Sequence, residues 1–544
     1  MKKRPRIVLI PTISLPVSKA SIYIPLGLLA IKSFIKEYAE VVISDLSILM
    51  KKGVLKADET FYQQAACYLL ELKADLYAFS TKSGSLVQTI AVAEQLKAIK
   101  QDALVALGGP QATACDEVIL DMYNIDFIIR GEGEIPFLNI AKALSENRSL
   151  RDILSLSFRE FKNKDEKRIG NMNELPMPAY EEYAEFYEHY LNNKPEFDIQ
   201  SYVPIDSARG CPSNCKFCYS PTMWKRKCGF KSPERLVEEV RYLHDRFGVD
   251  SFFFTEDNFT VSYHRIKQFC ELLLQEKFHI EWNCYSRIDT INKELIHLMK
   301  KAGCRQIYYG VESGSPKILK NLHKDYSVKQ ALNIIRFTIE EGIFVTASFI
   351  IGFPEEDASD IAVTLNAFLD TIVLGAISKL HLLGVEYGTV LYNEVENRMK
   401  FCPSVKTDIL EKEYLITRKM LSQISDNKKL FSYFYTYEQG IFVENWIKIF
   451  RVEYNYSLFQ RSLSAIRKSD GNENFLLEHL KKMINVNIKY PVGDSLEEKV
   501  LFFADVLIHC LTEKKRYDIT KIVKEDFNNW KEGNIQIKRI SKTL

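Results

Sequence analysis

The chain has 544 residues, of which 46% are hydrophobic and 26% are charged, and its formal net charge at pH 7 is +2. This length has room for about three domains of roughly 100–200 residues, each with its own core. The nearly neutral charge gives no reason to expect a nucleic acid or an anionic membrane as partner. No run reaches the ~18 apolar residues that a membrane span requires.

Basic residues precede an apolar run at the start of the chain, as they do in a secretory signal peptide. Pro11 and Pro16 interrupt this run and no small-residue cleavage site follows, so we expect a first strand and a cytoplasmic protein instead. The eleven cysteines, an odd number, agree with a reducing compartment. Eight are scattered through apolar segments and are expected to be small buried hydrophobic residues: Cys67, Cys115, Cys228, Cys270, Cys284, Cys304, Cys402 and Cys510.

Residues 1–150 alternate short β-branched runs with helical patterns such as 27–38 and 86–100. This alternation predicts an α/β unit with a parallel, doubly wound, Rossmann-like sheet. Ligands of such sheets bind at the carboxyl ends of the strands. The expected strands are 7–13, 41–45, 76–80, 104–108 and 127–130.

The alternation stops over residues 151–200. Two extended runs, 154–160 and 167–170, flank a polar turn at 162–166 and predict a hairpin. Prolines at 176 and 178 then favour an extended linker, because the residue before a proline avoids the helical region. We therefore expect a domain boundary here.

Strand and helix patterns alternate again over residues 201–400, with long helices such as 233–247 and 328–342. Six βα units predict a partial (βα)6 barrel with its active site at the carboxyl ends of the strands. From about residue 405 no strand signal persists, and a helical C-terminal domain is expected over residues 401–544. The expected strands are 202–208, 251–254, 279–284, 306–309, 344–350 and 377–383, and the expected C-terminal helices are 410–425, 443–467, 475–486, 496–513 and 518–531.

Three cysteines lie close together directly after the first of these strands, where residues 208–218 read ARGCPSNCKFC. Thiolates at Cys211, Cys215 and Cys218 are near enough in sequence to hold one metal centre. A zinc ion is the alternative, but a structural zinc site takes four ligands, usually as two pairs, and no second pair lies nearby. A [4Fe–4S] cluster on three cysteines leaves one iron open to another ligand.

This Cys-x3-Cys-x2-Cys loop, with aromatic Phe217 before the third cysteine, resembles the radical S-adenosylmethionine superfamily. The resemblance implies that the open iron binds S-adenosylmethionine, which is split to give a 5′-deoxyadenosyl radical. It also implies that the segments after the following strands bind the methionyl amine, the methionyl carboxylate, the ribose and the adenine. The residues expected to contact S-adenosylmethionine are Phe217, Glu256, Asp257, Arg287, Glu312 and Gly352.

Two glycine-rich runs end the fourth and fifth expected strands of the first unit: ALGGP at 106–110 and DFIIRGEGE at 126–134. Adjacent glycines let a backbone approach a ligand closely, although a tight βα turn also uses them. Together with PLGLL at 25–29 and FST at 79–81, these runs resemble the cobalamin-binding domain that precedes many radical S-adenosylmethionine barrels. The resemblance implies cobalamin contacts at Ser80, Thr81, Gly108, Gly109, Pro110, Arg130, Gly131 and Glu132.

The first unit lacks the Asp-x-His-x-x-Gly motif whose histidine binds cobalt in some cobalamin proteins, and no histidine precedes His189. The expected cobalamin therefore has no histidine from this unit as its lower ligand. Among proteins of this kind, that state favours methyl transfer. The alternative is a domain that has lost cobalamin and serves only as a scaffold.

The resemblance implies a methyltransferase that acts on an unactivated carbon of a peptide or natural-product intermediate through the 5′-deoxyadenosyl radical and methylcobalamin. No side chain is needed as a general base. Tyr308 and Tyr309 either touch substrate or belong to the core. The alternatives are a cyclase or ring-rearranging enzyme without net methylation, and a non-catalytic cobalamin-binding module. Methylthio transfer to RNA is disfavoured because residues 1–66 contain no cysteine for a second cluster.

The expected organisation is a cobalamin-binding domain at 1–150, a hairpin and linker at 151–200, a radical S-adenosylmethionine barrel at 201–400 and a helical domain at 401–544. The expected partners are a small-molecule or peptide substrate and an external electron donor of the flavodoxin or ferredoxin type. We expect a monomer that binds no nucleic acid.

Overall fold

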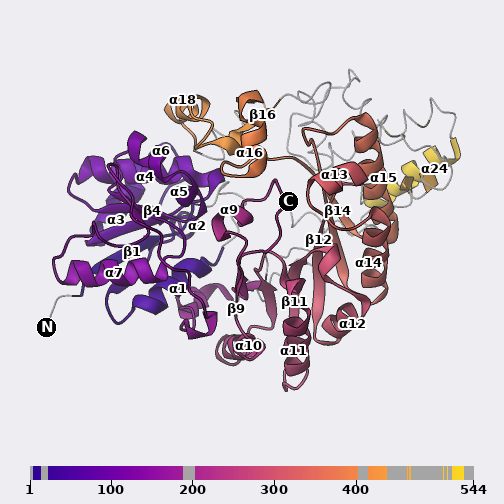
Figure 1. Cartoon of the computed structure of the whole chain (residues 1–544), viewed down its shortest axis with the longest axis horizontal. Coiled ribbons are helices and arrows are strands. Elements are labelled where there is room, and N and C mark those ends of the chain that lie inside the picture. Colours follow the sequence, from indigo (N-terminus) through magenta and orange to yellow (C-terminus); the bar gives the residue numbers. More distant parts are fainter. Residues whose placement is uncertain are drawn as a thin grey trace.

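The structure is a computed structural model. It describes residues 4–13, 23–187, 202–401, 415–437 and 517–531, with a few isolated positions between 462 and 511. Two α/β units lie side by side, the N-terminal one in indigo and the larger one in magenta to red (Figure 1). The helices expected at 443–467, 475–486 and 496–513 fall almost wholly outside the described residues.

The N-terminal unit is built on a six-stranded sheet of order β2-β1-β3-β4-β5-β6, parallel except for the last pair. On β1 (Arg6–Ile10), Ile7 and Leu9 enter one core while Val8 and Ile10 enter the other. Both faces are therefore covered, as a parallel sheet requires, and the doubly wound prediction is confirmed. The other strands are β2 (Glu40–Ile43), β3 (Leu76–Ser80), β4 (Val105–Gly108), β5 (Phe127–Ile129) and β6 (Leu156–Ser157).

Helices cover this sheet on both sides. Ile31 of α1 and Phe137 of α7 pack in the core that holds Ile7, whereas Phe61 of α3 and Leu86 of α4 pack in the core that holds Val8. Short helices occupy the connections. The helices of this unit are α1 (Leu26–Ile35), α2 (Leu46–Lys51), α3 (Phe61–Glu71), α4 (Leu86–Ile99), α5 (Pro110–Ala114), α6 (Asp116–Met122) and α7 (Glu134–Ser145).

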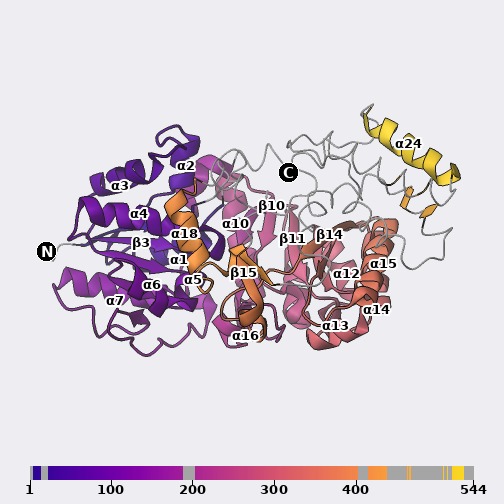
Figure 2. The ribbon, with the colours of Figure 1, turned by 90° about the horizontal axis from the view of Figure 1, so that it is seen from above.

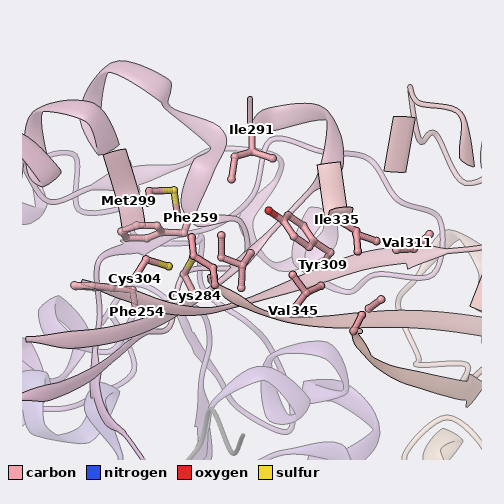
Figure 3. Close-up of a cluster of buried hydrophobic side chains, with 14 of the residues drawn as sticks. Phe254, Phe259, Cys284, Ile291, Met299, Cys304, Tyr309, Val311, Ile335 and Val345 are labelled. Carbon is pink, nitrogen blue, oxygen red and sulfur yellow. The ribbon is translucent and has the colours of Figure 1, made fainter. Parts of the chain in front are cut away.

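The second unit is a six-stranded parallel sheet of order β14-β13-β12-β11-β10-β7. Its edge strands β14 and β7 do not pair with each other, so the predicted partial barrel is confirmed. Apolar side chains such as Phe254, Phe259 and Val345 fill the space between sheet and helices (Figure 3). The strands are β7 (Val203–Ile205), β10 (Ser251–Phe254), β11 (Glu281–Ser286), β12 (Cys304–Glu312), β13 (Phe344–Ile351) and β14 (Ile377–Leu382).

Local capping explains why the barrel helices begin and end where the sequence predicts. In α10 the Ser232 side chain accepts a hydrogen bond from the Arg235 amide, Pro233 takes the first helical position, and Gly248 ends the helix at φ +67°. The helices of this unit are α9 (Ser220–Trp224), α10 (Pro233–Phe247), α11 (Tyr263–Leu273), α12 (Lys293–Lys301), α13 (Pro316–Asn321), α14 (Val328–Glu340), α15 (Ala358–Leu374) and α16 (Val390–Val395).

Two expected strands need correction. The run 202–208 is not one strand, because the chain leaves the sheet after Ile205 and forms β8 (Ala208–Arg209), which pairs antiparallel with β9 (Gly229–Phe230). The run 167–170 is not a strand, because the hairpin already closes at the Ser157–Lys162 bridge. The Ile169 amide donates to the Glu132 carboxylate instead of to a strand.

The eight cysteines outside the cluster were expected to be buried, and only some of them are. Cys115, Cys270, Cys284 and Cys304 are buried, but Cys67 is exposed and Cys228 is half-buried. Cys67 lies on the outer face of α3, where a small apolar side chain is tolerated in water. Cys402 and Cys510 lie outside the described residues.

Residues 415–437 form a segment, here called the strap, that returns from the barrel to the N-terminal unit (Figures 1 and 2). Its helix α18 (Arg418–Asp426) lies close to the expected helix, but its strand β16 (Tyr435–Tyr437) pairs with β15 (Met399–Phe401). The prediction of no strand beyond about 405 is therefore wrong, since an antiparallel pair of two short strands leaves little signal in sequence. The helix α24 (Tyr517–Lys531) lies where a helix was expected.

The strap packs into the N-terminal core. Met420, Ile424 and Phe431 belong to the same buried cluster as Val8 and the α3 and α4 side chains. The Tyr62 hydroxyl donates to the Leu415 carbonyl at 2.7 Å. The strap therefore joins the two units at a second place, remote in sequence from the linker.

Replacing Ile424 with alanine should lower the free energy of unfolding by about 2–5 kcal/mol, because this fully buried side chain leaves a cavity in the N-terminal core. Urea denaturation measures the loss. The matched control is Arg418→Ala, on the exposed side of the same helix, which should leave the midpoint nearly unchanged. Equal midpoints for Ile424→Ala and wild type would show that the strap adds no stability.

Candidate active site

The three clustered cysteines follow β8 at the carboxyl end of the barrel. Gly210 begins their loop at φ +96°, and a Cβ there would lie 2.2 Å from the Lys227 carbonyl oxygen, so only glycine fits. The Cys218 amide donates to the Cys215 carbonyl at 3.1 Å and closes the turn. Cys211, Cys215 and Cys218 line one cavity of about 220 Å³.

The number of thiols at this cavity bears on the two metal hypotheses. Cys211, Cys215 and Cys218 are the cysteines that line the cavity, which also has Asp257 and Glu312 on its wall. A structural zinc site takes four ligands, usually as two pairs, whereas three cysteines leave one iron of a cluster open. Three sulfur donors around such a cavity fit a [4Fe–4S] cluster better than a zinc ion.

Arg287, at the end of β11, reaches this cavity. Two of its nitrogens donate to the two oxygens of Asp289 at 2.8 and 2.6 Å, and the third donates to Cys215 Sγ at 3.1 Å. Asp289 thus orients the guanidinium toward the sulfur. Burial raises the pKa of Cys215, while the positive charges of Lys324 and Arg287 act against that rise and favour the thiolate.

Glu312 at the end of β12 faces the same cavity in a strained conformation. Its φ is +66°, and the register between β12 and β13 shifts between Gly310 and Glu312. Its carboxylate pairs with Lys324 at 3.0 Å, and both residues are buried. Strain in a non-glycine residue is typical of a functional position. Lys324 was not expected, because it lies in a loop after α13 with no motif around it.

Three further residues line the cavity. The Asp257 carboxylate accepts from the Ser220 hydroxyl at 2.6 Å. Phe217 packs edge-on against Phe353, with ring centroids 6.1 Å apart. Tyr308 lies on the wall, whereas Tyr309 is fully buried and bonds Thr338 on the helix side (Figure 3). Contacts of Phe217, Asp257, Arg287 and Glu312 with S-adenosylmethionine stay predictions.

Glu256 does not reach the cavity, so the expectation that it contacts S-adenosylmethionine is corrected. Its carboxylate accepts from Arg265 of α11 at 2.9 Å and from Ser207 at 3.1 Å, and all three residues are buried. Burial raises the pKa of Glu256 to about 7. Adjacent residues after a strand point to opposite sides, so Asp257 faces the cavity and Glu256 does not. Gly352 does not line the cavity, and its amide bonds Glu356; an adenine contact there stays a prediction.

A second cavity, of about 440 Å³, lies between the N-terminal sheet and the barrel mouth. Gly109 adopts φ +91°, and a Cβ there would lie 2.8 Å from the Thr81 carbonyl oxygen. Gly27 and Gly131 also line this cavity, and a Cβ at either position would meet nothing within 4 Å. Such a cradle fits a large cofactor that the backbone approaches closely. The expected cobalamin residues on its wall are Ser80, Gly108, Gly109, Pro110, Gly131 and Glu132.

Two expected cobalamin residues lie elsewhere. Thr81 is fully buried, and its hydroxyl donates to the Gly108 carbonyl at 2.8 Å and accepts from the Ala112 amide. Arg130 pairs with Asp165 at 2.9 Å and with Asp116 at 3.7 Å, and it does not line the second cavity. Both are therefore structural residues of the N-terminal unit.

Lys82 lines the second cavity and was not expected from sequence. Although its side chain reaches solvent, the surrounding protein removes enough water from it to lower the pKa of its ammonium group. A lysine after a parallel strand carries no motif that sequence reasoning could use.

Two family models match the chain. Residues 17–141 match the B12 binding domain, and residues 205–368 match the radical SAM superfamily. The first match covers the N-terminal sheet and the second covers the barrel through most of α15. Within the described residues, no helix has the length and apolar character needed to cross a bilayer.

Two curated relatives illustrate the range of similar proteins. An uncharacterized methyltransferase of Pyrococcus horikoshii is 30% identical over 346 residues, which are 63% of this chain and 72% of the relative. An anaerobic magnesium-protoporphyrin IX monomethyl ester cyclase of Rubrivivax gelatinosus is 24% identical over 303 residues. The chain spans about half of that cyclase, namely 54% of its length.

Among solved structures, the cobalamin-dependent S-adenosylmethionine radical enzyme OxsB with aqua-cobalamin bound has the same fold. The TM-score is 0.69 at 16% sequence identity, covering 99% of this chain and 83% of that one. At this identity the likeness concerns the fold alone.

Replacing Cys211, Cys215 and Cys218 together with alanine should abolish iron binding after anaerobic reconstitution, because no thiolate would remain at the cavity. Iron analysis and the visible absorption spectrum measure the outcome. The control is Cys228→Ala, which removes a nearby half-buried thiol that bonds the Gly210 carbonyl, and which should retain about four irons. Unchanged iron in the triple variant would contradict the cluster assignment.

Replacing Arg287 with glutamine should lower the midpoint potential of the cluster, because a positive charge and a hydrogen bond to Cys215 Sγ are lost. A redox titration followed by electron paramagnetic resonance measures the shift. Arg241→Gln, which removes an exposed arginine paired with Glu276, serves as the control and should leave the potential unchanged. A potential equal to that of wild type in Arg287→Gln would show that the contact does not tune the cluster.

Proposed function

The chain belongs to the cobalamin-dependent radical S-adenosylmethionine enzymes, and we propose that it methylates an unactivated carbon of a peptide or natural-product intermediate. Its cofactors are a [4Fe–4S] cluster, S-adenosylmethionine and cobalamin. The relative with 30% identity is named as a methyltransferase, which supports the reaction class but names no substrate.

The observation that carries the proposal is the meeting of the two cavities at Asp257. This carboxylate lies on the wall of the cysteine cavity and on the wall of the glycine-lined cavity. A substrate carbon beside Asp257 is therefore within reach of both cofactor sites, which is the geometry that radical formation followed by methyl delivery requires.

When bound, the cofactors supply the radical and the methyl group, and the protein supplies position and shelter from water. Arg287, held by Asp289, and Glu312, held by Lys324, present a cation and an anion at fixed places in the cavity. We propose that they bind the methionyl carboxylate and the ribose hydroxyls, respectively. Apolar Pro221 and Trp224, both on α9, line the cysteine cavity and the glycine-lined cavity, respectively.

A cyclisation or ring rearrangement without net methylation is the second candidate. The specific observation in its favour is the 24% identity to the magnesium-protoporphyrin cyclase over 54% of this chain. The two candidates use the same cofactor sites and differ in what happens to the substrate radical. We further propose that the enzyme is a cytoplasmic monomer that receives electrons from a flavodoxin or a ferredoxin.

The decisive experiment is an anaerobic assay with reconstituted enzyme, cobalamin, dithionite and S-adenosylmethionine carrying a deuterated methyl group. Candidate peptides and natural-product intermediates chosen from neighbouring genes serve as substrates. Mass spectrometry should show transfer of the labelled methyl group and formation of 5′-deoxyadenosine. The variant without the three cysteines is the control and should form neither product.

Each contrary result has a distinct meaning. A product that has lost hydrogen atoms without gaining label would favour cyclisation over methylation. Failure of the wild-type protein to retain cobalamin, read from its visible spectrum, would contradict the methyl-carrier role of the N-terminal unit.

A further inference from the structure

Arg209 is a barrel residue that binds the N-terminal unit through buried ion pairs. It lies on β8, two positions before Cys211, and only 10% of its side chain is exposed. Its guanidinium contacts Glu134, the first residue of α7, at 2.7 Å and Glu132, in the loop between β5 and α7, at 3.2 Å. It also contacts Asp206 of its own unit at 3.1 Å.

The two glutamates belong to the RGEGE run that was expected to face cobalamin. Glu134 is only 2% exposed and begins α7, where the helix N-terminus further stabilises its negative charge. The second oxygen of Glu132 accepts from the Ile169 amide at 2.9 Å. Both carboxylates are thus held by protein partners, and their use is to bind Arg209.

Arg168 extends the contact to the cysteine loop. It donates to the carbonyls of Lys227 at 2.8 Å and Arg209 at 3.2 Å, and its guanidinium lies 4.7 Å from the Trp224 ring centroid. Gly210 leaves no space for a side chain beside Trp224 and Lys227. The ion pairs, the start of the cysteine loop and α9 therefore form one close-packed unit.

This packed unit also borders the cavity between the two cofactor sites. Glu132, Glu134, Arg209, Gly210 and Trp224 all lie on the wall of the 440 Å³ cavity. A displacement of the ion pairs would therefore change the separation of Gly131 from Cys211, that is, of the two cofactor sites from each other. Buried charge pairs of this kind tolerate little displacement, because an unpaired buried charge is strongly unfavourable.

We propose that Arg209 is a positioning residue that sets the distance between cobalamin and the iron–sulfur cluster by clamping Glu132 and Glu134. The inference rests on the proposed function, because it assigns a role to the contact between the same two sites. It predicts that a change at Arg209 impairs one reaction more than the other. Cleavage of S-adenosylmethionine needs only the barrel, whereas methyl transfer needs both cofactor sites at the correct separation.

The test compares wild type with Arg209→Lys, which keeps the buried positive charge and lets the protein fold, but which cannot reach three carboxylates at once. Arg209→Gln is the stronger variant. The control is Arg235→Lys on α10, where the arginine is 14% exposed and contacts Glu238, Glu239 and the Leu175 carbonyl, away from both cavities.

The first measurement is the dipolar coupling between the reduced cluster and Co(II) in bound cobalamin, which reports their separation. The second is the yield of 5′-deoxyadenosine relative to labelled methyl transferred to cobalamin. In Arg209→Lys we expect a longer or broader distance distribution, deoxyadenosine close to the wild-type yield, and methyl transfer reduced on the order of a hundredfold. Arg235→Lys should match wild type in both.

Hydrogen exchange of the cofactor-free protein gives an independent readout: amides of residues 131–134 and 206–210 should exchange faster in Arg209→Lys. An unchanged distance between the cluster and Co(II) in Arg209→Lys would overturn the proposal. An equal loss of S-adenosylmethionine cleavage and of methyl transfer, without faster amide exchange, would also overturn it. Absence of cobalamin from the wild-type protein would instead refute the proposed function, and the exchange experiment would still decide whether Arg209 clamps the two units.

Discussion

Burial of Arg209 against Glu132 and Glu134 is the contact on which the arrangement of the two sheets depends. Apolar packing also joins the two units, since Ile24 and Leu29 of the N-terminal unit belong to the same buried cluster as the barrel side chains. Ion pairs are directional where apolar contacts are not. A guanidinium with two carboxylate partners in the other unit favours one relative orientation, and the strap adds a further attachment through Ile424 and Phe431.

The same physical logic recurs inside the cysteine cavity. Two ion pairs lie at this cavity, Glu312 with Lys324 and Arg287 with Asp289. Apolar side chains at these positions would stabilise the folded protein at least as well. Glu312 also adopts a backbone conformation that disfavours any side chain. Pairs that contribute little to stability, and that aim polar groups at an open cavity, are typical of a binding site for a charged ligand. S-adenosylmethionine, with its amine, carboxylate and sulfonium, is such a ligand.

Sequence reasoning succeeded where a pattern follows from short-range constraints. Strand–helix alternation predicted both sheets, since helices connect most of the successive parallel strands. Prediction failed for side chains whose partners are distant in the chain. Thr81 and Arg130 are adjacent in sequence to motif residues, but their side chains bind the Gly108 carbonyl and Asp165 instead of lining the cavity. Glu256 is adjacent to Asp257, but its carboxylate binds Arg265 and does not reach the cysteine cavity. Glu132 lines the cavity as expected, but its carboxylate is engaged by a barrel residue 77 positions away.

By itself, the sequence determined the three thiolates, the glycines that permit close approach of a cofactor, and the order of the βα units. These features rest on spacing within a few residues and on backbone conformations that only glycine adopts readily. Tertiary structure decided which neighbours of those residues face the cavities, that Asp257 belongs to both of them, and that Lys324 and Lys82 join the sites. The reason is that burial and charge pairing depend on which elements pack together, and residues distant in the chain become neighbours only when the two sheets meet.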